Sequence, residues 1–317
     1  MVDRVEIAEA AELKELGDMP IDDVMAIMDG EVPDYRQLYY RWERQQWEAG
    51  AIDFSDDRRQ WIEDFSPDLR RSFLWGLASF YVAEDQVTNT LVPFVDAAPS
   101  EEHSVFLTTQ LADAARHIVF FDRFYSEALD EQGSDMKSRL ERQTERLNTG
   151  FRTLLLEMLP EAAERIRRER GSTTALMEGV VLYHVVIEAS LALTGQRFLL
   201  NYTRDEDLLP GFRQGFTAVA RDGSRHVNFG VGFLKEMVER DRNNAQIIQG
   251  TLMRVVPIAL TVMEPPGGDM SYFDPLPYGP DDLIAFAYES LEKRLRVIGV
   301  EPADLMAPGL LAEKRSD

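Results

Sequence analysis

Apolar residues recur every three or four positions along most of the chain, which predicts α-helices throughout. Four long helices are predicted, and each places polar side chains inside its apolar stripe: residues 66–91, 100–129, 172–202 and 210–240. Shorter or more polar helices are predicted over residues 135–158, from 160 onward, over 243–263 and over 281–298. There is neither strand-like alternation of useful length nor an internal repeat, so the fold class is all-α.

The first 34 residues differ from the rest because they are acidic, weakly periodic and broken by Pro20 and Pro33. We expect residues 1–34 to be an N-terminal extension with one or two short helices. Residues 35–317 are then expected to form one helical domain, whose length and 44% hydrophobic content allow a sizeable core.

Each long helix carries one buried-looking ionisable residue near its midpoint: Glu84, His117, Glu188 or His226. A Glu buried as an unpaired charge costs several kcal/mol, so these residues must meet partners. One interpretation is a shared metal site. The other is a metal-free ring of Glu–His and Asp–His hydrogen bonds that holds the helices in register. Four such residues at equivalent places favour the metal site.

Two matching segments, "DAARH" and "DGSRH", place an Asp four residues before each His. In helical di-metal carboxylate proteins the corresponding pattern is Glu-x-x-His, because residues three apart on a helix reach one ion together. The Glu positions are Ala114 and Gly223 in this chain. Two divalent ions without bridging carboxylates would repel each other, so the pattern predicts one iron or manganese ion, or none.

His184 lies one helical turn before Glu188 on the same face. It is a candidate extra ligand that would compensate for the lost carboxylates. The alternative is a hydrogen-bonded core histidine.

The chain resembles the ribonucleotide reductase small-subunit-like ligand-binding oxidases, a ferritin-like family, over roughly residues 40–298. The segments that carry the resemblance are "RWERQQWEAGAIDFSDDRRQW", "FYVAEDQVTNTLVPF", "FFDRFYSEAL", "LYHVVIEASLALTG", "LLPGF" and "RHVNFG". The resemblance implies a helical bundle with a four-helix core and a manganese–iron or di-iron centre. Of the family's six ligands, the positions retained here are Glu84, His117, Glu188 and His226.

The resemblance also assigns the positions around those ligands. The two bridging Glu residues fall on Ala114 and Gly223, and Asp113 and Asp222 resemble the acids that orient the His rings. The family forms a tyrosine–valine ether crosslink, for which the matching pair is Tyr183 and Val87. It also binds a long-chain fatty acid in an apolar tunnel against the metals.

Composition excludes several other classes of protein. The formal charge of −22 argues against nucleic-acid binding and against an anionic membrane surface. With no cysteine, thiolate metal sites and disulfides are excluded. We expect no membrane span and no secretory signal, which makes cytoplasmic the expected location. A homodimer is expected from the resemblance, because ferritin-like relatives often pair through their long helices.

Three functions remain open at this point. The first is an oxidase-like oxidoreductase with a degenerate metal site, holding one ion or none, beside a tunnel for an apolar carboxylate. The second is a metal-free lipid-binding or regulatory protein. The third is a reductase small subunit, which requires a complete metal or radical site and a C-terminal tail that "LMAPGLLAEKRSD" does not resemble.

Overall fold

The structure, a computed structural model, describes residue 21, residues 32–129, 131, 133 and 135–301. Within these residues the chain is helical and contains no strand, which confirms the all-α, ferritin-like prediction. The α-helices are α3 Tyr35–Arg44, α4 Ser55–Glu63, α5 Pro67–Thr90, α6 Val92–Asp96, α7 Glu101–Arg123, α8 Met136–Glu145, α9 Thr149–Phe151, α10 Leu159–Arg168, α11 Thr173–Val180, α12 Leu193–Asp205, α13 Pro210–Arg240, α14 Asn244–Thr261 and α15 Pro280–Ile298.

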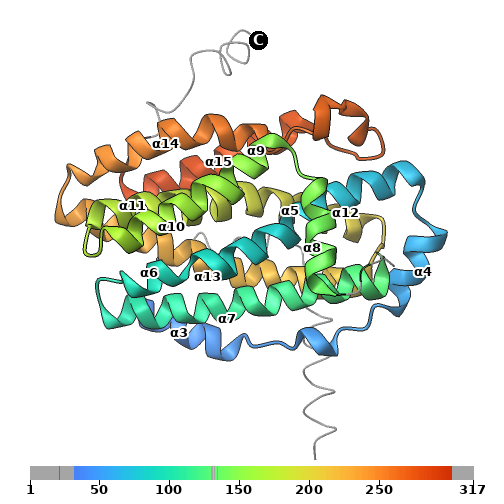
Figure 1. The fold of residues 1–317 in the computed structure, drawn as a ribbon, viewed down its shortest axis with the longest axis horizontal. Helices are drawn as coiled ribbons and strands as arrows, with labels where there is room; N and C mark the ends of the chain where they lie inside the picture. Colours follow the sequence, from blue (N-terminus) through green and yellow to red (C-terminus); the bar gives the residue numbers. More distant parts are fainter. Residues whose placement is uncertain (1–20, 22–31, 130, 132, 134, 302–317) are drawn as a thin grey trace, which may run out of the picture.

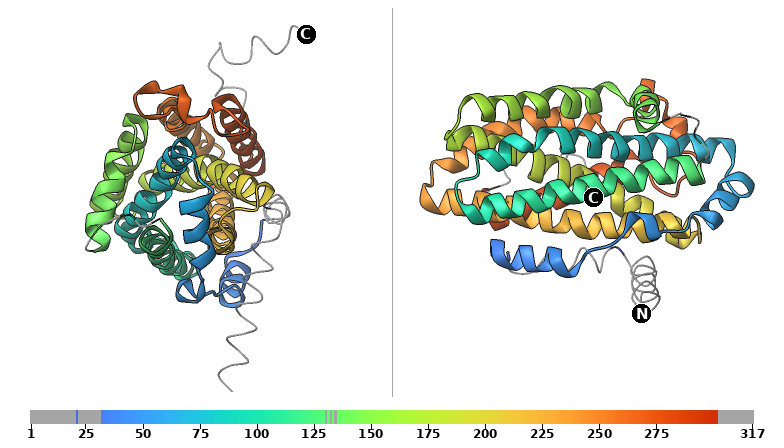
Figure 2. Two further views of the ribbon diagram at one scale, coloured as in Figure 1. Left: turned by 90° about the vertical axis from the view of Figure 1, so that its right-hand side faces the viewer. Right: turned by 60° about the horizontal axis from the view of Figure 1, so that its bottom comes forward.

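The long helices run side by side along the length of the molecule, as Figure 1 shows for α5, α7 and α13. Serine side chains begin two of them: Ser66 accepts a hydrogen bond from the backbone of α5, and Ser100 does the same for α7. Viewed from the end in Figure 2, the helices surround a common interior. One hydrophobic cluster, from Ile21 to Val300, fills that interior.

The third long helix of the core is continuous from Thr173 to Asp205, but its middle, Val181–Ala192, has π-helical hydrogen bonding. This helix is long and apolar enough to cross a membrane by length and composition alone. In the structure, 78% of its most apolar window is buried among other helices. A central bundle helix is apolar on all sides, and it therefore passes the same test as a membrane span.

The polar helices on one side of the bundle begin and end at residues other than those predicted. The predicted helix over residues 135–158 is interrupted after Glu145, where Asn148 caps a new helix by accepting a hydrogen bond from Phe151 N at 2.7 Å. That new helix runs without a break from Thr149 to Arg168, so the prediction of a separate helix after Pro160 is wrong. π-helical turns just before Pro160 change the hydrogen-bond pairing where the proline lacks its N–H.

Helix α13 begins without a cap from its own N-cap residue, because Leu209, whose backbone is left-handed with φ of 51°, has no side-chain acceptor. The buried Asp57 of α4 supplies the cap instead. Its two carboxylate oxygens accept hydrogen bonds from Gly211 N at 2.8 Å and Phe212 N at 2.7 Å. A side chain far away in sequence thus stabilises the first turn of a core helix.

Helix α3 lies outside the core along α7 and α13, as Figures 1 and 2 show and the contacts between these helices agree. The predicted N-terminal extension, residues 1–34, lies outside the described residues except for Ile21 and residues 32–34. The division at residue 34 stays a prediction. Near the other end, residues 264–279 form an irregular connection to α15.

Candidate metal centre

Four helical segments each bring one predicted ligand to the middle of the bundle. Glu84 of α5 lies with its Oε1 3.1 Å from Nδ1 of His117 on α7. Glu188, in the π-helical segment, lies with its Oε1 3.3 Å from Nδ1 of His226 on α13. The two imidazole ring centres are 6.4 Å apart. The four residues therefore gather in one place as two Glu–His pairs, which we call the inner layer.

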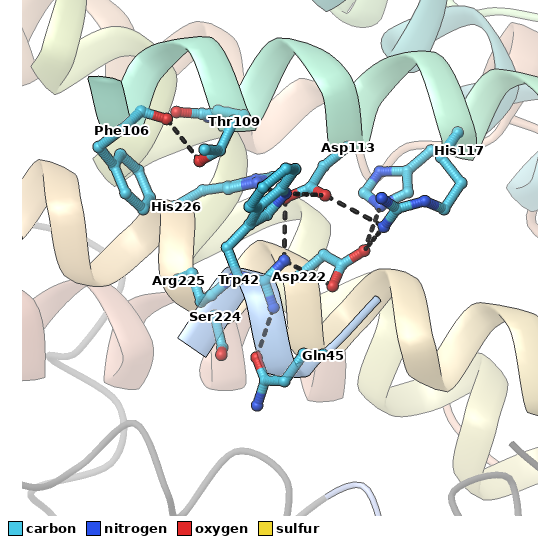
Figure 3. Close-up of polar contacts among 12 residues, drawn as sticks. Trp42, Gln45, Phe106, Thr109, Asp113, His117, Asp222, Ser224, Arg225 and His226 are labelled. Carbon is cyan, nitrogen blue, oxygen red and sulfur yellow. Dashed lines mark hydrogen bonds and ion pairs between the residues drawn. The ribbon is translucent and has the colours of Figure 1, made fainter. Parts of the chain in front are cut away.

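The other nitrogen of each imidazole contacts an aspartate from the opposite helix. His117 Nε2 on α7 lies 3.1 Å from Asp222 Oδ2 on α13. His226 Nε2 on α13 lies 3.2 Å from Asp113 Oδ2 on α7. Both contacts tie α7 to α13, and Figure 3 shows the two helices facing each other across them. Each Asp reaches the His of the facing helix because both helices carry the same Asp-to-His spacing.

Two arginines join the aspartates into one network. Arg225, only 1% exposed, approaches Asp113 at 2.9 Å and Asp222 at 2.7 Å. Arg116 approaches the same two carboxylates at 3.2 and 3.4 Å. Charge-assisted bonds of this kind let two carboxylates stay ionised although they are fully buried. We call these four residues, two Asp and two Arg, the outer layer.

The segment around α3 closes the outer layer from outside. Trp42 Nε1 donates to Asp113 at 3.0 Å, and Trp47 Nε1 donates to Asp222 at 2.8 Å. The Gln45 side chain accepts a hydrogen bond from Arg225, a contact drawn in Figure 3. Sequence reasoning did not assign these residues to the site. The dense aromatic run "YRQLYYRWERQQWEAG" was the available signal, but it does not reveal which partners the indoles would find.

Both imidazoles are positively charged in this arrangement. A ring whose two nitrogens both face carboxylates must donate from both, which only the protonated form can do. Burial alone lowers the pKa of His117, but Glu84 and Asp222 outweigh burial and raise the pKa to about 10. Burial is likewise outweighed by Glu188 and Asp113 at His226, whose pKa rises to about 9.

The outer layer also fixes the charge of its own carboxylates. Burial alone would raise the pKa of Asp222, but Arg225 and His117 hold that pKa well below its usual range. Across both layers, four carboxylates face two guanidinium and two imidazolium groups. The centre is therefore charge-balanced without any metal.

A dinuclear metal centre does not fit these residues. The two positions that would supply bridging carboxylates hold Ala114, which is 1% exposed, and Gly223, whose added Cβ would lie 3.4 Å from Glu188 Oε2. Among the described residues, no group of three or more His, Asp or Glu side chains is arranged to hold an ion. With the bridging carboxylates gone, the two charges of Glu84 and Glu188 cannot offset the repulsion between two divalent ions.

His184, the candidate extra ligand, points to a different partner. Its Nε2 lies 3.1 Å from Gln110 Oε1. Complete burial lowers the pKa of His184 to about 3, so the ring is neutral. This arrangement is that of a hydrogen-bonded core histidine.

The predicted crosslink pair lies beside the inner layer. Tyr183 is buried, and its hydroxyl donates a hydrogen bond to Glu188. Val87 is also buried, one helical turn after Glu84 on α5. The crosslink itself stays a prediction.

An apolar cavity of about 150 Å³ lies between the helices of the bundle, and none of the four inner-layer residues lines it. Its wall includes Ala83 and Ile187, the residues directly before Glu84 and Glu188. From there it extends between α5 and α12 to the connection that precedes α15. The structure thus places a partly open apolar pocket one residue away, along the chain, from two of the candidate ligands.

Comparison with known proteins gives one family and one group of solved structures. Residues 25–264 match the family model described as ribonucleotide reductase, small chain. An R2-like ligand-binding oxidase variant with an anaerobically reconstituted Mn/Fe cofactor is 22% identical, with a TM-score of 0.72 over 84% of this chain and 93% of that chain. A second variant of such an oxidase is 23% identical, with a TM-score of 0.71 over the same shares. At these identities the structural likeness shows the shared fold.

Proposed function

The chain belongs to the ribonucleotide reductase small-chain family, and on that premise we propose that it is an oxidase-like ligand-binding protein with a degenerate metal centre. The centre holds at most one divalent ion. An apolar cavity whose wall includes Ala83 and Ile187, the residues before two members of the centre, receives the ligand. The similar solved structures are R2-like ligand-binding oxidases with Mn/Fe cofactors, which supports the ligand-binding part of the proposal.

The observation that carries the proposal is the survival of the inner layer without its bridging carboxylates. To hold a single ion, the four inner-layer residues, Glu84, His117, Glu188 and His226, would have to move from the present arrangement, in which no three such side chains are placed to bind one. Their two carboxylates balance one divalent charge once the imidazoles are neutral. Two His and two Glu suit iron or manganese, and such an ion would supply redox chemistry at the centre.

The metal-free form is a second candidate, favoured by the charge balance of the two layers. Each imidazole already bridges a Glu and an Asp, so every inner-layer charge has a partner without an ion. In this form the protein binds its ligand but has no metal-dependent oxidation. A reductase role is not part of the proposal, because it requires a complete metal or radical site.

Metal content decides between these forms. The experiment is elemental analysis of protein purified without added metal and again after loading with iron or manganese, together with anomalous diffraction at both edges. We expect one ion per chain or fewer, located between the two Glu–His pairs. Two fully occupied ions per chain would refute the proposal.

The Tyr183–Val87 pair reports whether oxidation survives. Forming the ether removes the hydroxyl hydrogen of Tyr183 and one hydrogen from Val87, with dioxygen as the oxidant. Intact mass should therefore fall by two hydrogens after aerobic iron or manganese loading, and peptide mapping should locate the bond. A Tyr183→Phe variant is the control. An unchanged mass would remove the oxidase activity from the proposal and leave ligand binding.

A further inference from the structure

A polar pocket lies where α3 and α7 begin and α13 ends. It has a volume of about 410 Å³, is open to solvent, and shares no lining residue with the two layers of the centre. We propose that it is a second, metal-independent active site that hydrolyses small carboxylic esters, with Ser100 as nucleophile, His103 as base and Glu236 as a positioning residue. This inference goes beyond the proposed function and does not rest on it.

The hydroxyl of Ser100 has an imidazole as its nearest partner. Ser100 precedes α7, and its Oγ lies 2.7 Å from Nδ1 of His103, three residues later. The bond that caps the helix is longer, since His103 N approaches the same Oγ at 3.5 Å. The exposed Glu102 approaches Oγ at 3.1 Å, where water competes for its carboxylate. The shortest contact of this hydroxyl is therefore with a base, which is what a serine nucleophile requires.

The other nitrogen of the same imidazole faces a carboxylate. His103 Nε2 lies 3.6 Å from Glu236 Oε2, and this buried nitrogen has no hydrogen-bond partner among the described residues. Glu236 is held in turn by the Tyr35 hydroxyl, which donates to it at 3.0 Å, and by an ion pair with Arg240. A carboxylate on this side favours the tautomer with hydrogen on Nε2. Nδ1 is then free to accept the proton of Ser100.

The imidazole of His103 is uncharged and fixed in orientation. Its side chain is buried, and burial lowers its pKa although Glu236 opposes that change. The Tyr35 ring packs against it with ring centres 4.1 Å apart, and Phe233 meets it edge to face at 5.7 Å. An uncharged ring can accept a proton at neutral pH, whereas a protonated ring cannot. The arrangement thus has an oriented base beside the hydroxyl.

The proposed reaction needs neither a metal nor an oxidant. Ser100 Oγ forms a bond to the acyl carbon while its proton passes to Nδ1 of His103. The ester C–O bond breaks, and that proton leaves with the alcohol. Water then attacks the acyl-serine, gives one proton to Nδ1, and releases the carboxylic acid as the Ser100 hydroxyl is restored.

The charge of the pocket indicates which esters it accepts. The described part of its lining carries three carboxylates and two guanidinium groups: Asp34, Glu102, Glu236, Arg36 and Arg240. The excess of negative charge disfavours an anionic ester. Among the described lining residues only Pro99 and Tyr35 offer much apolar surface, so a long acyl chain would bury little area there. The substrate class is therefore a short, uncharged ester.

The first test labels the nucleophile with diisopropyl fluorophosphate, using the full chain freed of metal by a chelator. One phosphoryl group per chain should replace the hydroxyl hydrogen of Ser100 as fluoride leaves, and peptide mapping should locate it. Ser100→Ala should take up none. Ser66→Ala is the matched control and should be labelled like the parent protein. Ser66 caps α5 by accepting from Leu69 N at 3.2 Å, but it has no histidine three residues later.

Hydrolysis of 4-nitrophenyl acetate tests the other two roles. His103→Gln should lower kcat by about a hundredfold, as loss of a general base does. Glu236→Gln should lower kcat by about tenfold and leave KM unchanged, because Glu236 acts on the imidazole and does not touch the ester. The anionic 4-nitrophenyl hydrogen succinate should react with a kcat/KM about tenfold lower than the acetate.

Absence of label, or label on another residue, would overturn the inference. So would equal rates of hydrolysis by the parent protein and Ser100→Ala, or an unchanged kcat in His103→Gln or Glu236→Gln. If Ser100→Ala does not fold, Ser100→Gly replaces it, since glycine is accepted at a helix N-cap. Because these assays use metal-free protein, their failure leaves the metal proposal standing, and failure of the metal proposal leaves this one standing.

Discussion

The outer layer lies on α7 and α13, and the inner layer adds one residue each from α5 and the π-helical segment, yet the two layers differ in completeness. In the outer layer each Asp has two Arg partners and an indole donor. In the inner layer the two positions next to those aspartates hold Ala114 and Gly223 in place of carboxylates. The groups that position the imidazoles are therefore present in full, whereas the groups that would share the metals with them are missing.

Electrostatics gives a physical reason for this difference. Removing one member of a buried ion-pair network strands a charge and costs about 3–5 kcal/mol. Removing a bridging carboxylate from a metal-free inner layer instead stabilises the folded protein, since it takes away a negative charge that would face Glu84 and Glu188. The bundle thus tolerates loss of the bridging ligands but not loss of the outer layer.

Restoring the missing carboxylates should have the largest effect. Ala114→Glu combined with Gly223→Glu should raise metal content from at most one ion to two per chain, because the bridging charge returns. At position 223 the new Cβ meets Glu188 Oε2 at 3.4 Å, an ordinary contact. Elemental analysis after iron or manganese loading measures the result.

The uncharged pair Ala114→Gln with Gly223→Gln is the control for side-chain size, and it should gain no ion. If both double variants bound the same amount of metal, the two positions would not be the reason for the incomplete inner layer. Without metal, the double Glu variant should also unfold at a lower temperature than the parent protein.

Breaking the outer layer should have the next largest effect. Arg225→Met leaves Asp113 and Asp222 without their most buried cation and should lower the free energy of unfolding by about 3–5 kcal/mol. Arg116→Met is the matched control, because Arg116 contacts the same carboxylates but its side chain is 15% exposed. It should cost about 1–2 kcal/mol. Denaturant unfolding of metal-free protein compares the two, and equal losses would contradict the difference in burial.

Helical periodicity was sufficient to predict the bundle, the four inner-layer residues and the helices that carry them. It works there because a polar residue on an apolar stripe is visible in the sequence itself. The cap from Asp57, the indole donors Trp42 and Trp47, and the crossed Asp–His contacts were not predicted. Each joins residues more than 70 positions apart, and no local spacing specifies such a partner.

Asp57 sharpens the comparison because it is a fully buried carboxylate, like Asp222, but lies outside the arginine network. Burial raises the pKa of Asp57 to about 6, although hydrogen bonds from Phe212 N and Gly211 N pull it down. The folded state then holds the proton more tightly than the unfolded state, whose Asp titrates near pH 3.9. Stability from this group is present below about pH 4 and is lost as pH rises through about 6, by up to about 3 kcal/mol.

Asp57→Asn should remove this dependence of the free energy of unfolding on pH. Denaturant unfolding at several values between pH 4 and pH 7 should show the parent protein losing stability relative to the variant as pH rises. A difference between the two proteins that stays constant over this range would show that Asp57 is ionised in both states.

The smallest predicted effect is a difference in stability between the two Glu–His pairs of the inner layer. Glu188 accepts a hydrogen bond from Tyr183 as well as facing His226, and these partners hold its pKa below its usual range despite burial. Glu84 faces His117 without a corresponding tyrosine. Glu188→Gln should therefore cost about 1 kcal/mol more than Glu84→Gln, the difference between a hydrogen bond to a charged group and one to a neutral group.

A double-mutant cycle with Tyr183→Phe tests whether the hydrogen bond from Tyr183 causes that difference in stability. The cycle with Glu188→Gln should give a coupling of about 1 kcal/mol, because Glu188→Gln removes the charge that strengthens the hydrogen bond and Tyr183→Phe removes the bond itself. The cycle with Glu84→Gln should give a coupling near zero. Equal couplings would mean that Tyr183 acts on both carboxylates through the shared charge of the inner layer, and the two halves would then be energetically alike.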